Sequence, residues 1–325
     1  MREVNYSQAI NEALLEEMRR DPMVITLGED IAAIGGNFGV TKGLLDEFGP
    51  ERVKDTPISE DAIVGLTLGA SLVGARPVAE IMFSTFLGCC MEELSNQVGA
   101  IRYMNGGQIT TPLVVRTVNS LGRSGAAQHS GRNEAWIMHT PGMKVAIPAT
   151  PYDAKGLLKT AIRMDDPVVF FEHALMYYKI TGPVPEEEYT IPFGVADVKR
   201  EGSDVTIVAY QMMVHKALEA AEILAEEGIE AEVVDPRTLV PLDVDTIVES
   251  VKKTNRLIVA TEECARAGVN GEIAFVAMEE AFDYLDAPIA RVAAANVPVP
   301  FSPPLEEYMM PKTEDIVETA RRLMG

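Results

Sequence analysis

A carboxylate opens an apolar segment near residue 60. Residues 55–60 read Asp-Thr-Pro-Ile-Ser-Glu, and a Gly- and Ala-rich stretch with almost no charge continues to Gly74. Ser59 is of the N-cap type, and apolar or small residues then recur at helical spacing, at positions 62, 63, 66, 69, 70 and 73. Glu60 can complement the positive end of the helix dipole, or it can exchange a proton with a bound ligand. Spacing alone leaves both interpretations open.

A second candidate group lies in a segment of small residues. Residues 122–132 read Gly-Arg-Ser-Gly-Ala-Ala-Gln-His-Ser-Gly-Arg, which places the His129 imidazole among guanidinium and hydroxyl groups. Loops held by a rigid scaffold often carry functional groups, so a functional role is favoured over a flexible surface loop. The other histidines, His139, His173 and His215, are dispersed without metal-ligand spacing. His173 and His215 are interpreted as structural or surface residues.

Several common site patterns are missing from the chain. No G-x-G-x-x-G follows the first expected strand, and no Gly-Lys pair suggests a phosphate-binding P-loop. Neither G-x-S-x-G nor H-E-x-x-H occurs. The sequence therefore argues against a dinucleotide fingerprint, a serine-hydrolase elbow and a zinc-protease motif.

Composition restricts the class of protein. The 325 residues carry a formal net charge of −21, which argues against nucleic acid as a partner and against adsorption to anionic membranes. The longest apolar stretch, 63–75, is shorter than the roughly 20 residues needed to cross a bilayer. The N-terminus lacks a signal or transit pattern, and Cys89, Cys90 and Cys264 form no disulfide framework. We expect a soluble protein of the reducing cytoplasm.

The elements expected to position these groups alternate between helix and strand. Before residue 180 we expect helices at 7–20, 60–74, 86–102 and from 151, with strands at 23–27, 77–82, 112–115, 143–147 and 167–171. After it, strands at 205–209, 231–234 and 257–260 alternate with helices at 214–227 and 271–284. This pattern predicts an α/β protein of two doubly wound domains with mainly parallel sheets. The predicted domains are 1–180 and 196–325, joined by a Pro- and Glu-rich linker at 181–195.

With these pieces in order, the chain resembles a known family. This is the beta subunit of the thiamine-diphosphate-dependent decarboxylating component of 2-oxo acid dehydrogenase complexes, which act on pyruvate, acetoin or branched-chain substrates. The resemblance runs from end to end, and its stretches are specific in this order and spacing. They are residues 55–60, 74–80, 102–107, 127–130, 141–145, 153–158, 166–168, 237–243 and 253–255.

The resemblance implies a pyrimidine-binding domain followed by a transketolase-like C-terminal domain. It implies that Glu60 contacts N1′ of the aminopyrimidine of thiamine diphosphate, where a carboxyl group favours the imino tautomer that removes the thiazolium C2 proton. Phe86 matches the aromatic residue against that ring, although without the resemblance it reads equally well as a core residue. Met82 matches a residue lining the same pocket. His129 matches the active-site histidine near the lipoyl channel, with an expected role in reductive acylation.

The resemblance also implies ions and partner proteins. Potassium is expected at backbone carbonyls of Leu113, Ala161, Ile162, Met164 and Asp166, although Met164 stands where related chains often have aspartate. Magnesium and the diphosphate need a Gly-Asp-Gly element, yet this chain has no Gly-Asp pair. An alpha subunit is therefore expected to supply that half of the site in a heterotetramer. The expected acceptor is a lipoyl acyltransferase core.

The choice of substrate stays open at this point. Residues 87–91 differ from the pyruvate type and are closer to acetoin-type chains, so pyruvate or acetoin ranks above branched-chain acids. The adjacent cysteines there are interpreted as small core residues rather than a redox pair. One alternative is the C-terminal half of a split transketolase. Another is a scaffold subunit that has lost its site.

Overall fold

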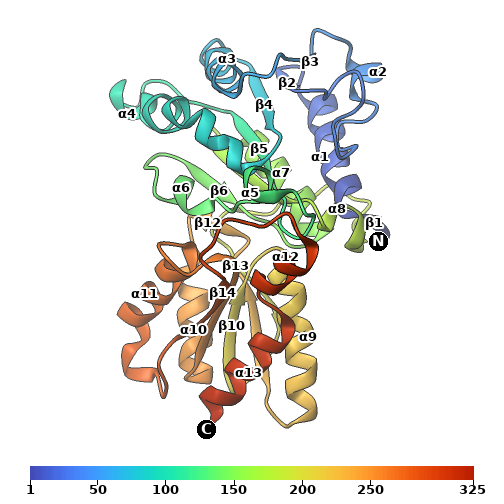
Figure 1. Cartoon of the computed structure of the whole chain (residues 1–325). Helices are drawn as coiled ribbons and strands as arrows, with labels where there is room; N and C mark the ends of the chain where they lie inside the picture. Colours follow the sequence, from blue (N-terminus) through green and yellow to red (C-terminus); the bar gives the residue numbers. More distant parts are fainter.

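The computed structural model describes residues 1–325 and places them in two layered α/β halves (Figure 1). The strands form sheets of seven, five and two members. Their bounds are β1 Arg2–Asn5, β2 Val24–Gly28, β3 Val53–Asp55, β4 Arg76–Ile81, β5 Val114–Asn119, β6 Lys144–Ala146, β7 Val168–His173, β8 Thr181–Val184, β9 Asp197–Arg200, β10 Val205–Ala209, β11 Ala231–Asp235, β12 Thr238–Val240, β13 Leu257–Cys264 and β14 Ala290–Ala294.

Helices cover both faces of the two large sheets. None of them combines the length and apolar composition that crossing a membrane requires. The α-helices are α1 Tyr6–Arg20, α2 Leu44–Phe48, α3 Glu60–Leu72, α4 Ile101–Met104, α5 Ala126–His129, α6 Glu134–Met138, α7 Pro151–Arg163, α8 Met176–Lys179, α9 Met212–Glu226, α10 Val244–Thr254, α11 Val269–Ala281, α12 Pro303–Met309 and α13 Thr313–Met324. The other helical turns are η1 Ser84–Cys89, η2 Glu93–Val98 and η3 Phe282–Tyr284.

The seven-stranded sheet has the order β12-β6-β7-β5-β4-β2-β3, and all its pairs are parallel except β12 with β6. The five-stranded sheet has the order β14-β13-β10-β11-β9, with only β9 antiparallel. Strands such as β10, in which all five residues are buried, are apolar because helices cover both faces. The predicted fold class, two mainly parallel doubly wound halves, is confirmed.

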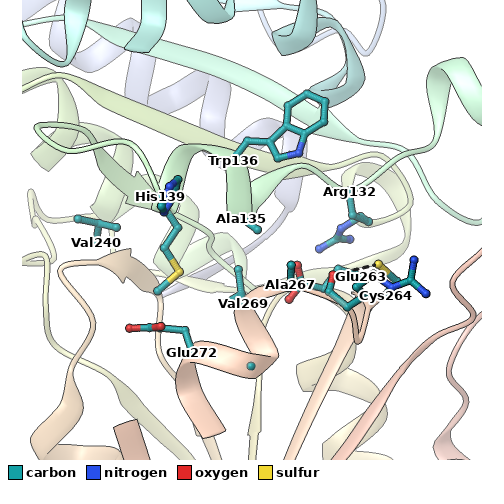
Figure 2. A pocket seen from close by; sticks show the side chains of 14 residues that line it. Arg132, Ala135, Trp136, His139, Val240, Glu263, Cys264, Ala267, Val269 and Glu272 are labelled. Carbon is teal, nitrogen blue, oxygen red and sulfur yellow. Dashed lines mark hydrogen bonds between the residues drawn. The ribbon is translucent and has the colours of Figure 1, made fainter. Parts of the chain in front are cut away.

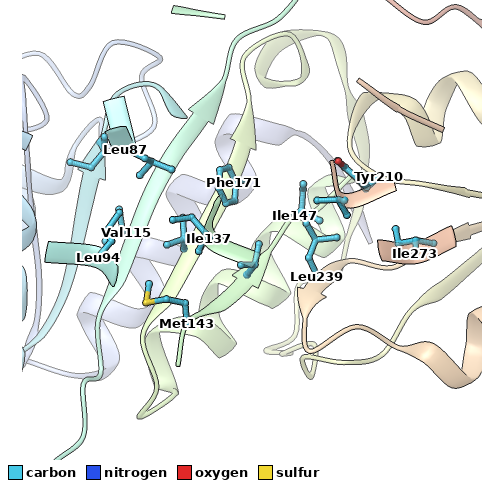
Figure 3. Close-up of a cluster of buried hydrophobic side chains, with 14 of the residues drawn as sticks. Leu87, Leu94, Val115, Ile137, Met143, Ile147, Phe171, Tyr210, Leu239 and Ile273 are labelled. Atoms are coloured by element: carbon cyan, nitrogen blue, oxygen red, sulfur yellow. The ribbon is translucent and has the colours of Figure 1, made fainter. Parts of the chain in front are cut away.

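The boundary between the halves is more interwoven than the sequence suggests. Strand β12 belongs to the C-terminal half of the chain but pairs with β6 at the edge of the N-terminal sheet. The first residues of the expected linker form β8, which pairs with β1. One buried cluster contains side chains from both halves, including Phe171, Tyr210 and Leu239 (Figure 3). The domain limits at 180 and 196 remain a prediction.

The prediction of a single helix over 86–102 is wrong. The chain instead forms the 3-10 turn η1, the wide π-helical turn η2 and the short α4. Gly99 lies between η2 and α4 at a close approach of two backbones, since a Cβ on Gly142 would lie 2.0 Å from the Gly99 carbonyl oxygen. Glycine also disfavours a continuous α-helix, and Gly88 lies within η1.

Candidate active site

The candidate residues gather at one edge of the large sheet. Strands β5, β4, β2 and β3 are neighbours and run parallel, so their carboxyl ends meet at the same edge. Glu60 follows β3, Met82 and Phe86 follow β4, and His129 follows β5. Ligands of open α/β sheets bind outside this edge.

Glu60 is the first residue of α3 and is half-buried. Ser59 occupies the N-cap position as predicted, but its side chain makes no capping hydrogen bond. Burial raises the pKa of Glu29, in the loop after β2, and the nearby Glu60 carboxylate raises it further. The pKa of Glu29 is thus raised by burial and by a second carboxylate nearby, which places two acidic side chains at this edge of the sheet.

An aromatic cluster surrounds His129. The ring centroids of Phe83 and Phe86 lie 5.1 and 5.4 Å from that of His129, both in edge-to-face geometry. The two phenyl rings are 5.5 Å apart. Met82 lies just before the cluster, and its Sδ accepts a hydrogen bond from Asn37 Nδ2 at 2.9 Å. The cluster offers flat apolar surfaces beside an imidazole, which suits a heteroaromatic ring.

The helix that begins at Glu60 contacts the turn that belongs to this cluster. Helix α3 packs against η1, the turn that carries Phe86. The pKa of Cys90, which directly follows η1, is raised by burial, then by Cys89 and by Glu60. Cys90 is buried and Cys89 is exposed, so the core interpretation of the pair fits only Cys90.

Hydrogen bonds within the chain already occupy several of the carbonyls expected to bind potassium. Arg76 Nη1 donates to the carbonyl oxygens of Ile162 and Met164 at 3.0 and 2.9 Å. The Ala161 carbonyl accepts from the amide of Met164, and the Leu113 carbonyl from that of Val168. The Asp166 side chain pairs with Arg102. Carbonyl oxygens are suitable ligands for a hard cation, and the assignment of potassium remains a prediction.

Sequence reasoning missed a buried ion cluster across β4, β5 and β7. Arg116 Nη1 donates to Glu80 Oε2 at 2.8 Å, and its Nε donates to Glu172 Oε1 at 2.6 Å. The Arg116 side chain is 2% exposed. Tyr177 adds a 2.5 Å hydrogen bond to Glu172. The available signal was a charged residue inside each of three apolar strands, because buried charges need partners.

A second buried network joins the two halves at the end of the His129 loop. Arg132 donates to Glu134 and to Glu262, with Nη1 2.5 Å from Glu262 Oε2. His173 Nε2 lies 2.9 Å from the same Glu262 oxygen. Burial alone would raise the pKa of Glu262, but His173 and Arg132 outweigh it and lower the pKa to about 2. His173 is thus a fully buried member of an ion network, in keeping with its structural interpretation.

A large cavity lies beside this network rather than at Glu60. It has a volume of about 810 Å³, and Figure 2 shows Arg132 and Trp136 on one side with Glu263, Cys264 and Glu272 on the other. Glu60, Phe86 and His129 are not among its lining residues. A site completed by a second subunit is an open surface in one chain, so the cavity does not argue against the Glu60 site.

Comparison with known proteins supports these observations. Residues 2–179 match the pyrimidine-binding domain of transketolase, and residues 194–316 match the transketolase C-terminal domain. The chain also matches the solved structure of a split-gene transketolase, an inactive beta4 tetramer, with a TM-score of 0.78. Identity there is 25%, covering 99% of this chain and 98% of the other.

Several dehydrogenase subunits have higher identity. The beta subunit of acetoin:2,6-dichlorophenolindophenol oxidoreductase from Cupriavidus necator is 49% identical, covering 99% of this chain and 98% of the relative. Pyruvate dehydrogenase E1 component subunit beta from Bacillus subtilis is 46% identical, covering 100% and 99%. The 2-oxoisovalerate dehydrogenase subunit beta from the same organism is 45% identical, covering 98% of each. These relatives favour the dehydrogenase reading over the split transketolase, and the chain belongs to the family of beta subunits of thiamine-dependent acetoin and 2-oxo acid dehydrogenases.

Proposed function

We propose that this chain is the beta subunit of an acetoin or pyruvate dehydrogenase component, active in the cytoplasm as a heterotetramer with an alpha subunit. The observation that carries the proposal is the arrangement at α3, where Glu60 heads a helix whose outer side is apolar and uncovered. Leu66 is 56% exposed, and Val73 just beyond the helix is 83% exposed. Contiguous exposed apolar surface marks an interaction site, so the carboxylate lies at the rim of a subunit interface.

Within that interface, Glu60, Phe86 and Met82 would hold the aminopyrimidine of thiamine diphosphate. The coenzyme supplies the carbanion chemistry when bound. Glu60 would share a proton with N1′ of the ring, and Glu29 is a second acidic side chain near this position. Phe86 would lie against the ring, and the Met82 thioether, fixed by Asn37, would line its edge.

His129 would act later, on acyl transfer to the lipoyl group. It is exposed at the sheet edge while its ring rests on Phe83 and Phe86. A lipoyl acyltransferase core would deliver the acceptor, and the acidic chain would suit a basic docking module.

Ions complete the proposal. Magnesium and the diphosphate would be held by the alpha subunit, because this chain has no Gly-Asp pair to begin the usual motif. Potassium would bind near the carbonyls of residues 113 and 161–166. The carbonyl oxygens of Ile162 and Met164 keep second lone pairs beyond the Arg76 contacts.

The function is tested by reconstitution with an alpha subunit. We expect turnover that depends on thiamine diphosphate and magnesium, with acetoin or pyruvate preferred over branched-chain 2-oxo acids, measured by reduction of 2,6-dichlorophenolindophenol. The chain alone should neither bind the coenzyme tightly nor turn over. Activity on ketose phosphates without 2-oxo acid activity would favour the transketolase alternative. Absence of coenzyme binding in the heteromer would favour the scaffold alternative.

The partner surface gives a separate prediction. Leu66→Glu places a charge on the exposed side of α3 and should abolish co-purification with the alpha subunit while leaving the fold intact, because an unpaired charge in an interface is strongly unfavourable. The matched control is Ile223→Glu on α9, where Ile223 is 39% exposed in the other half of the chain. Normal assembly of the Leu66 variant, measured by size-exclusion chromatography with light scattering, would place the partner elsewhere.

A further inference from the structure

The segment 122–132, which carries His129, has a backbone conformation that needs contacts with other parts of the chain to stabilise it. Gly122, Ser124 and Ala126 have φ angles of +87°, +56° and +59°. Residues other than glycine rarely adopt such left-handed conformations, and they persist only where surrounding contacts impose them. Short α5 inside the segment adds few internal hydrogen bonds, since it spans only Ala126–His129.

Glu306 supplies such contacts at the start of the segment. Its Oε1 accepts from the Gly122 amide at 2.8 Å, and its Oε2 accepts from the Ser124 amide at 2.7 Å and from Ser124 Oγ at 3.3 Å. Glu306 is 2% exposed and comes from α12, which lies beside the green His129 segment in Figure 1. Both carboxylate oxygens of Glu306 thus accept hydrogen bonds from one turn in the N-terminal half of the chain. A buried carboxylate with two backbone donors makes strong, charge-assisted hydrogen bonds.

The far end of the segment is held by the same half of the chain. Arg132 donates to Glu262 in β13 and, through Nη2, to Gln211 Oε1 at 2.9 Å. Figure 2 shows the Arg132 side chain beside Glu263 and Cys264, the last two residues of β13. Its side chain is only 4% exposed. The C-terminal half therefore clamps the segment at both ends.

The middle of the segment rests on the turn η1. Thr85 Oγ1 donates to the Gln128 carbonyl at 2.5 Å, and Ser84 Oγ donates to the Gly131 carbonyl at 3.0 Å. The clamp at the two ends and this support in the middle together fix the His129 ring against Phe83 and Phe86.

We propose that Glu306 is a positioning residue, which fixes the left-handed turn at 122–126 and so aims His129 for acyl transfer. The inference rests on the proposed role of His129 but adds a residue some 180 positions away in sequence, in the C-terminal half. A merely structural Glu306 would stabilise the chain without a selective effect on one step.

The first test measures the segment directly. Glu306→Gln puts an amide donor against a backbone donor, so one charge-assisted bond is lost. Peptides covering 122–132 should exchange amide hydrogen about tenfold faster in the full chain, while peptides covering β10 stay unchanged. The control is Glu307→Gln, the neighbouring exposed acid whose contact with Lys312 is 3.7 Å. Unchanged exchange over 122–132 would overturn the proposal.

The second test measures the rate of acyl transfer to the lipoyl group. In the reconstituted heterotetramer, Glu306→Gln should lower the rate of acyl transfer to a lipoyl domain by about tenfold to 100-fold, since small displacements of a reacting group have effects of that size. Dye reduction, which bypasses the lipoyl group, should stay within about twofold because coenzyme activation is untouched. Adding Glu306→Gln to His129→Ala should cause no further loss, because the two residues act as one unit.

The outcomes distinguish this inference from the proposed function. If the unaltered heterotetramer shows no thiamine-dependent turnover, the proposed function fails. The amide-exchange measurement alone then decides whether Glu306 holds the segment 122–132 in place. If turnover is present but Glu306→Gln slows dye reduction and acyl transfer equally, or adds its full effect to His129→Ala, Glu306 is structural and the inference is overturned.

Discussion

Replacing Glu60 with glutamine is expected to slow turnover of the reconstituted enzyme by about 100-fold or more, the usual size of an acid–base contribution. Glutamine keeps the size of the side chain and the start of α3, but it cannot share a proton with a ring nitrogen. The decrease should appear equally with the dye and with the lipoyl acceptor, since both follow coenzyme activation. Exchange of the thiazolium C2 proton, followed by NMR, measures the affected step directly.

Asp61→Asn is the matched control for Glu60→Gln. Asp61 lies in the same first turn of α3 and is equally placed to complement the helix dipole. If Glu60 served only the dipole, both variants would lose the same few tenths to about 1 kcal/mol of stability and little activity. Undiminished C2 exchange in Glu60→Gln would end the catalytic assignment.

Replacing Arg116 with methionine is expected to destabilise the chain by about 3–5 kcal/mol, the usual effect of breaking a buried ion pair from one side. Burial would lower the pKa of Arg116, but Glu172 and Glu80 outweigh it and raise the pKa above its usual value. The change leaves both carboxylates buried without their cation. The measurement is urea unfolding of the full chain.

Arg19→Met is the control for the buried cluster. Arg19 also binds a carboxylate through two nitrogens, with Nε 2.6 Å from Glu47 Oε1, but its side chain is 57% exposed. Exposed pairs contribute about 1 kcal/mol or less. A similar loss for the two variants would show that burial does not amplify the Arg116 cluster.

The sequence predicted elements whose pattern was strong and local. Helix α7 has the predicted start, with Thr150 accepting from the Asp153 amide and Pro151 at the first position. Strands β10 and β13 were visible as short apolar runs. The segment after β4 was not predictable in the same way, because its mixture of 3-10, π and α turns comes with a close approach of Gly99 to Gly142, 43 positions apart, that no local pattern indicates.

The residues of the candidate site also differ in whether local sequence or distant contacts reveal them. Glu60 and His129 stood out because their residue types and local surroundings suggested chemistry. Glu29 and Glu306 did not, because each acquires a role only through contacts that the fold creates. Glu306 lies among other acids near the C-terminus, and nothing in that stretch indicates that its carboxylate reaches the amides of Gly122 and Ser124.

Strand β12 comes from the C-terminal half of the chain but pairs with β6 of the N-terminal sheet, and this limits where the chain can be cut into two fragments. Ending a recombinant fragment anywhere in 181–237 would remove the strand whose Thr238 and Val240 pair with Ala146 and Val145, leaving β6 with a bare hydrogen-bonding edge. Such edges invite association with other chains. Gene fission or domain shuffling in this lineage would therefore have to carry residues 238–240 along with the first half, or supply a substitute strand.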